Sequence, residues 1–110
     1  GGAKTETITL AKAETIGLGK ALSIGAAYQV SVGAAMNTTV GLSKSEQVML
    51  NKATKVGKKF NTVVGEEYVL RVGKATFVMK SDGTVIINGV KFEFSASGQV
   101  NIAGKDVDIN

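Results

Sequence analysis

The sequence predicts an all-β fold, specifically an intertwined triple-stranded β-helix (trimeric β-prism) with octapeptide repeats. Three observations lead to this prediction. Glycine recurs every eight residues through most of the first 73 positions, and an Ile or Val stands just before each repeat position. Thr, Val, Ile and Tyr, which favour extended backbone, fill much of the remaining sequence. A regular bend in an otherwise extended chain accounts for all three.

The octad repeat is defined by ten positions spaced eight apart, from Gly1 to Gly73, of which only Thr9 and Met49 are not glycine. We expect about seven extended residues and then a corner in each octad, because glycine accepts the positive φ or crowded backbone of a sharp corner. The predicted corner glycines are Gly17, Gly25, Gly33, Gly41, Gly57, Gly65 and Gly73. The predicted core aliphatic row is Ile8, Ile16, Ile24, Val32, Val40, Val48, Val56, Val64 and Val72.

A helix does not fit this period. At 3.6 residues per turn, a repeat of eight drifts by about 80° in each period, so the aliphatic residues would form no stripe. Glycine every eight residues would also cost about 1 kcal/mol per site in a helix.

The octads are too small to bury themselves, because each one presents a single aliphatic row residue. Stacked units must therefore close a core around an axis. Either one chain winds as a solenoid or three chains wind together. A period of eight with one aliphatic residue favours three chains, each contributing one octad per level, and so predicts a homotrimer.

Charges recur at the third and fifth positions after each repeat position. They place opposite charges two residues apart in Lys4/Glu6, Lys12/Glu14 and Lys44/Glu46, which offsets like-charge repulsion along each ladder. We expect these side chains to point outward. Strict alternation would put them on the face of the aliphatic row, so this expectation requires a break in alternation at the bend.

A second period of fifteen residues begins near residue 75 and divides the chain into two predicted regions. Residues 1–74 form the octad-repeat β-helix shaft, and residues 75–110 form a C-terminal β-prism of ~15-residue repeats that ends in the tip. We expect strands with turns at residues 82–83, 88–89, 97–98 and 103–104. Asn88-Gly89 could mark an isolated hairpin, but continued winding with a different strand length is preferred.

Composition argues against several functional classes. The chain has no Cys and no His, which removes thiolate ligands and the commonest general base, and we expect no catalytic, cofactor-binding or metal-binding residues. The net charge of +4 comes from interspersed charges, which favours a solvated surface over a nucleic-acid site. No run approaches the ~18 apolar residues of a membrane span. The segment has no signal-peptide pattern, and its first residue suggests a piece of a longer protein.

The run TIG…SIGAAYQVSVGAAMNTTVG…KVGKKFNTVVG…RVGKATFVMKSDGTVIING resembles the C-terminal β-helical needle of the VgrG family of type VI secretion spike proteins. It is also similar in design to the needles of contractile-phage tail spikes. The resemblance extends from about residue 4 to the end.

The resemblance implies a homotrimeric, non-enzymatic needle that punctures a target membrane transiently. It implies a PAAR-repeat tip protein as partner at the C-terminal end, secreted effectors as cargo, and attachment to the tail tube through an N-terminal hub that this chain lacks. The implied location is the cytoplasm of a bacterial producer, followed by injection through the cell envelope. The residues expected to dock the tip are Asp106, Val107, Asp108, Ile109 and Asn110.

Two other functions can be weighed against the needle. The first is a trimeric, phage-like fibre segment for adhesion to a receptor or glycan, for which we would expect an aromatic cluster at the tip; the last six residues hold no aromatic side chain. The second is an enzyme on a solenoid, such as a hexapeptide acyltransferase, which would need a catalytic His.

Overall fold

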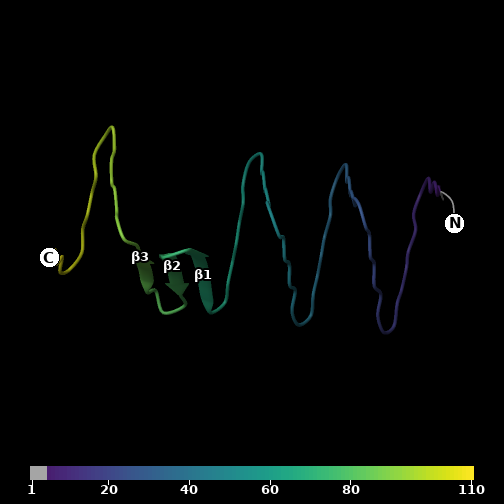
Figure 1. Cartoon of the computed structure of the whole chain (residues 1–110), viewed down its shortest axis with the longest axis horizontal. Coiled ribbons are helices and arrows are strands. Elements are labelled where there is room, and N and C mark those ends of the chain that lie inside the picture. The colour runs from purple at the N-terminus through teal and green to yellow at the C-terminus, as the bar shows by residue number, and fades with distance from the viewer. Residues whose placement is uncertain (1–4) are drawn as a thin grey trace. The chain divides into compact units, whose positions relative to one another are not determined.

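The computed structural model describes residues 5–110, and the described chain is all-β, as predicted. Its regular elements are β1 (Glu67–Val72), β2 (Ala75–Lys80) and β3 (Val85–Asn88), which form an antiparallel sheet in the order β1-β2-β3 (Figure 1). The chain divides into two units, Gly1–Met49 and Leu50–Asn110, and the sheet lies in the second.

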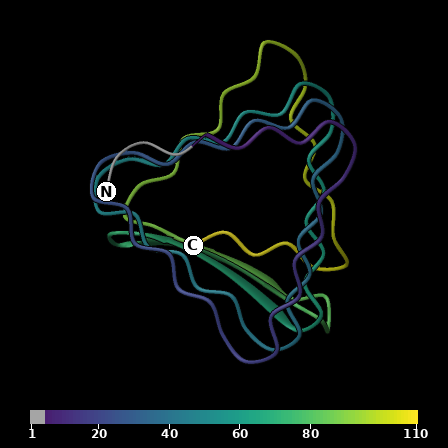
Figure 2. The same ribbon diagram turned by 90° about the vertical axis from the view of Figure 1, so that its right-hand side faces the viewer.

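In the first unit, extended chain bends once every eight residues. The bends fall at residues 9–10, 17–18, 25–26, 33–34 and 41–42, with another beginning at residue 49. Figure 2 shows this unit, in purple to blue, as straight runs joined by turns. The sequence in each run is rich in Thr, Ser, Ala and aliphatic residues, which suits extended backbone.

The second unit continues this pattern and then changes it. Bends fall at residues 57–58 and 65–66, and the three-stranded sheet follows directly. Residues 89–110 contain no assigned strand, although further bends occur at residues 97–98 and 105–106. The period changes where the chain folds back on itself.

The β1–β2 connection corrects one sequence expectation. Val72 pairs with Ala75, which leaves Gly73 and Lys74 as a two-residue loop. Gly73 has a φ of 55°, and a glycine with positive φ at the first loop position is the arrangement of a type II′ hairpin turn. The preference for continued winding from residue 75 is therefore wrong for β2 and β3, which pair with their sequence neighbours as hairpins.

The β2–β3 connection is a three-residue loop, residues 81–83. Lys80 N–H donates to the Thr84 carbonyl at 3.0 Å, and Gly83 N–H donates to the Lys80 carbonyl at 3.1 Å. Gly83 has a φ of 92°, which fits a turn closed by a glycine bulge. The expected turn at residues 82–83 lies in this loop.

Gly83→Ala should destabilise the sheet by about 1–2 kcal/mol, because an L-side chain is strained at this positive φ. Added Cβ atoms would meet no other atom within 4 Å there, so the cost comes from the backbone angle alone. Urea unfolding followed by circular dichroism measures the loss. Gly83→Asn is the control, since Asn accepts the left-handed region and should recover most of the stability; equal losses for Ala and Asn would contradict this reasoning.

Asp82 fastens the same loop by accepting a hydrogen bond from the Thr84 backbone N–H at 3.0 Å. This bond, which favours the carboxylate, lowers the pKa of Asp82 below its ordinary value. The small stabilisation from Asp82 is thus present above the unfolded-state pKa and is lost as the pH falls through the folded-state pKa. An NMR titration of the Thr84 amide should report this transition at acidic pH. Asp82→Asn should keep the turn and abolish the titration, whereas an unchanged titration would assign it to another group.

Glycine was expected at the corners because a sharp corner needs positive φ or leaves no room for a Cβ. Neither condition holds at most of the corners within this chain. Among the described residues only Gly73 and Gly83 have positive φ. A Cβ added at any of the six other corner glycines would meet no atom within 4 Å. Since Thr9 and Met49 also stand at bends, the chain's own backbone does not require glycine at these positions.

Candidate self-association surface

The described chain has no buried side chain, either apolar or polar. The accessible surface of the chain is 12122 Å² for a mass of 11.3 kDa. A compact monomer of this mass exposes about 5,700 Å², and a fully unfolded chain about 16,000 Å². A chain folded in this way gains little from the hydrophobic effect on its own.

The aliphatic row has a nearly constant environment. The eight residues from Ile8 to Val64 are each 45–50% exposed, and Val72 at the end of the row is 72% exposed. By contrast, the leucines at the second position of four of the bends are 91–105% exposed; they are Leu10, Leu18, Leu42 and Leu50. The row is half covered by its own chain, and its other half is open.

The extended backbone is similarly open. In the described chain, the turn and inter-strand backbone hydrogen bonds fall between Glu66 and Asn88. The octads before them and residues 89–110 contribute none of these bonds. Backbone N–H and C=O groups require partners, from water or from another chain. β1 and β3 also each have one unpaired edge.

The sheet carries one wholly apolar face, which the sequence analysis missed. Side chains alternate along a strand, and the register aligns Tyr68 with Met79, Leu70 with Phe77, and Phe77 with Ile87. This apolar face consists of Tyr68, Leu70, Val72, Ala75, Phe77, Met79, Val85 and Ile87. The opposite face is mixed and holds Glu67, Val69, Arg71, Thr76, Val78, Lys80, Ile86 and Asn88. The β1 residues of the apolar face, Tyr68, Leu70 and Val72, occupy the third, fifth and seventh positions after Gly65. Val72 is the last member of the aliphatic row, so the apolar face continues this row.

Two hollows lie along the apolar face. The larger, of about 380 Å³, is lined by Thr62, Val63, Val64, Glu66, Tyr68, Met79, Lys80 and Ser81. The smaller, of about 220 Å³, is lined by Leu70, Val72, Ala75, Thr76, Phe77, Ile87, Asn88, Gly89, Lys91 and Phe92. The smaller hollow is lined mainly by apolar side chains, whereas the larger one has an equal number of apolar and polar residues.

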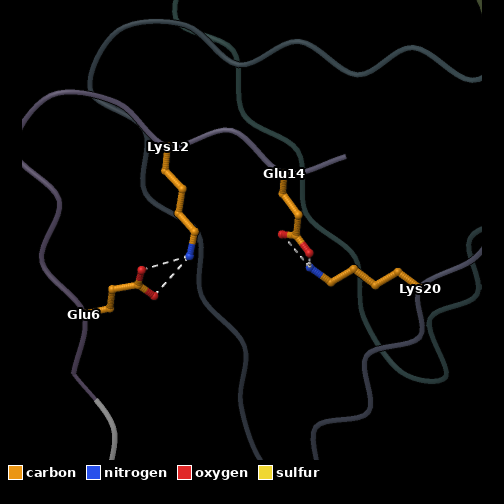
Figure 3. Close-up of polar contacts among 4 residues, drawn as sticks. All are labelled: Glu6, Lys12, Glu14 and Lys20. Atoms are coloured by element: carbon orange, nitrogen blue, oxygen red, sulfur yellow. Dashed lines mark hydrogen bonds and ion pairs between the residues drawn. The ribbon is translucent and has the colours of Figure 1, made fainter. Parts of the chain in front are cut away.

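Ion pairs cross the bends of the first unit. Lys12 Nζ lies 2.9 Å from Glu6 Oε1, and Lys20 Nζ lies 3.1 Å from Glu14 Oε2. Figure 3 shows each pair pointing toward one another from the runs on either side of a bend. The partners are six residues apart, so each lysine pairs with a carboxylate of the preceding octad. Lys12 therefore does not pair with Glu14, the opposite charge two residues away that the sequence pattern placed beside it. Lys4 lies outside the described residues.

The C-terminal segment presents aromatic and charged residues on alternating positions. The rings of Phe92 and Phe94 stack with centroids 6.4 Å apart, while Lys91 Nζ and Glu93 Oε1 lie 2.9 Å apart. A Cβ added at Gly89 would lie 3.3 Å from the Phe92 ring, so a larger residue at this position would require the ring to shift by a few tenths of an ångström.

The five residues predicted to dock a tip protein follow the bend at residues 105–106 or take part in it. Val107 and Ile109 are exposed, and Asp106, Asp108 and Asn110 stand between and beside them. The structure places these residues together in one extended segment without a strand partner.

Residues 5–110 contain no group of three or more His, Cys, Asp or Glu side chains that could hold a metal ion. They also contain no helix that is long and apolar enough to span a membrane. The geometry instead brings together three features of a self-association surface: the half-covered row, the open backbone and the apolar sheet face. Comparison with protein-family models, curated proteins and solved structures found no match to this chain.

Proposed function

We propose that this chain is one strand of a homotrimeric, intertwined triple-stranded β-helix. The observation that carries the proposal is the aliphatic row, half exposed at every octad in a chain without a buried side chain. The chain exposes about 6,400 Å² more than a compact monomer of its mass would. That excess is larger than the 2,000–5,000 Å² that obligate interfaces typically bury.

Three copies would bury the aliphatic side chains and pair the backbone N–H and C=O groups that one copy leaves exposed. Each level would bring together three row residues in a closed core, and neighbouring chains would pair the extended backbone of successive octads. A closed prism of this kind has no lateral strand edges, so it resists both unzipping and aggregation. Room for a neighbouring chain would also account for glycines that the chain's own conformation does not require.

We further propose that the trimer is the puncturing needle of a type VI secretion or related contractile injection spike. The support is the resemblance of the octads and of residues 75–89 to VgrG needles, together with a fibre that ties three chains at each level. In this proposal the needle is not an enzyme and needs no cofactor. It is made in the bacterial cytoplasm, pierces the target envelope and carries effectors. A PAAR-repeat tip protein docks at residues 106–110.

Binding experiments separate the needle from an adhesive fibre. Purified trimer should bind a panel of PAAR-repeat proteins, as measured by biolayer interferometry, and should bind no sugar on a glycan array. Val107→Asp with Ile109→Asp should abolish PAAR binding, whereas Thr39→Asp, at an exposed site far along the chain from the tip, should leave it unchanged. Glycan binding without PAAR binding would support the adhesin and refute the needle.

A further inference from the structure

The Glu–Lys pairs that cross the bends share a face with the aliphatic row. Bends occur at residues 9–10 and 17–18, and none occurs in the run of residues 11–16 between them. In an extended run, side chains two apart point the same way. Lys12, Glu14 and Ile16 therefore lie on one face, and the break in alternation that outward charges would need is not available within this run.

The ion pairs themselves place that face on the inside of the bend. Six extended residues span about 20 Å, further than a lysine and a glutamate side chain can bridge together. The 2.9 Å and 3.1 Å contacts therefore need the bend, and they need side chains within its inner angle, because side chains on the outer side of a corner diverge. Figure 3 shows the side chains of each pair directed toward one another.

Exposure and charge pattern agree with this placement. The paired side chains are 49–57% exposed, close to the 45% and 46% of Ile8 and Ile16. From residue 5 to residue 54, every charged residue is even-numbered, as is every member of the aliphatic row. These residues are Glu6, Lys12, Glu14, Lys20, Lys44, Glu46 and Lys52. The odd-numbered positions of the same stretch hold only Gly, Ala, Ser, Thr, Asn and Gln, apart from Met49 at a bend.

We infer that these pairs form charged layers inside the assembled trimer, stacked among apolar layers, and that they set the axial register in which three parallel copies combine. This inference rests on the proposed trimer. The run at residues 11–16 carries Lys-Glu-Ile on its inner face, whereas the run at residues 27–32 carries Tyr28, Val30 and Val32. A copy displaced by two octads would bring charges against apolar side chains, where an unpartnered charge is costly. Buried polar pairs are best attested in this role, in which they select a register at some cost in stability.

The first test compares one introduced charge on the two faces of the same run. Glu14→Lys removes one pair and adds a second inner cation; it should lower the melting temperature of the trimer by about 5 °C or more. Ala13→Lys, on the other face, should lower it by less than about 2 °C. Glu14→Lys combined with Lys20→Glu should restore the wild-type melting temperature. If Glu14→Lys and Ala13→Lys both formed trimers with the same melting temperature, the inference would be wrong. The proposed trimer itself would not be contradicted.

The second test measures register directly. The chain has no cysteine, so Ser23→Cys gives a unique spin-label site on an odd-numbered position. In-register copies should give one narrow distance distribution by double electron–electron resonance. Replacing all four paired residues, Glu6, Lys12, Glu14 and Lys20, with Leu should keep a trimer of equal or higher melting temperature but broaden that distribution. A distribution that stays narrow would refute the register role, and a monomer in every variant would refute the proposed function along with it.

Discussion

Val40→Asp is expected to prevent assembly of the chain into its oligomer. Val40 lies in the middle of the aliphatic row and is 49% exposed, like its counterparts in the other octads. Three copies would bring three carboxylates together at one level of an apolar core, at a cost of several kcal/mol for each unpaired ion. That cost is comparable to the whole stability of a small domain, about 5–15 kcal/mol.

The measurement is the solution mass of the variant by light scattering, with thermal unfolding followed by circular dichroism. Thr39→Asp is the matched control, because Thr39 is the adjacent residue and lies on the opposite face of the same run. The control should assemble like the wild type. A Val40→Asp chain that assembled and melted like the wild type would show that the row does not face inward.

Phe77→Asp is expected to remove both the apolar sheet face and the assembly that depends on it. Phe77 is one of three half-buried residues in the described chain, and it lies between Leu70 and Ile87 in the register. Truncating a phenylalanine that is fully buried, as Phe77 would be in the proposed trimer, typically costs about 3–5 kcal/mol. A carboxylate in its place adds the cost of desolvating a charge. The loss should appear as lower oligomer mass and earlier unfolding in urea.

Thr76→Asp tests the same strand on its other face. Thr76 is the neighbour of Phe77 and aligns with Arg71 and Asn88, in polar surroundings that accept a carboxylate. This variant should keep the wild-type mass and most of its stability. If Thr76→Asp and Phe77→Asp were equally damaging, the two faces of the sheet would not differ in the way described here.

The octad pattern could be predicted because it is local and periodic. Glycine at the repeat position and an aliphatic residue before it predict where extended chain turns, and the structure bends at each of these positions between residues 9 and 66, including Thr9 and Met49. The all-β class was predicted for the same reason. The positive φ expected as the reason for glycine at the corners is found, among the seven predicted corner glycines, at Gly73 alone.

The hairpin could have been recognised from sequence but was missed. Residues 67–72 continue the octad pattern without interruption, so they look like another run of the winding. The signal was Gly73 followed by Lys74, a two-residue loop between the alternating runs YVLRV and ATFVMK, which is typical of a hairpin. The uninterrupted octad period through Val72 hides this hairpin signal.

The partners of the charged residues could not be predicted from spacing alone. Lys12 lies two residues from Glu14 and six from Glu6, and along an extended chain the nearer carboxylate is the obvious partner. The bend reverses this preference, because it brings the ends of two runs together on its inner side. That outcome depends on the angle of the bend, which the sequence does not specify.

The most direct test of the central claim is the mass of the chain in solution, by light scattering on a sizing column. An intertwined trimer should appear as a species of three times 11.3 kDa that elutes early for its mass, because it is elongated. A species of 11.3 kDa that unfolds cooperatively would mean that one chain buries its own row, and this would contradict both the intertwined trimer and the needle built from it.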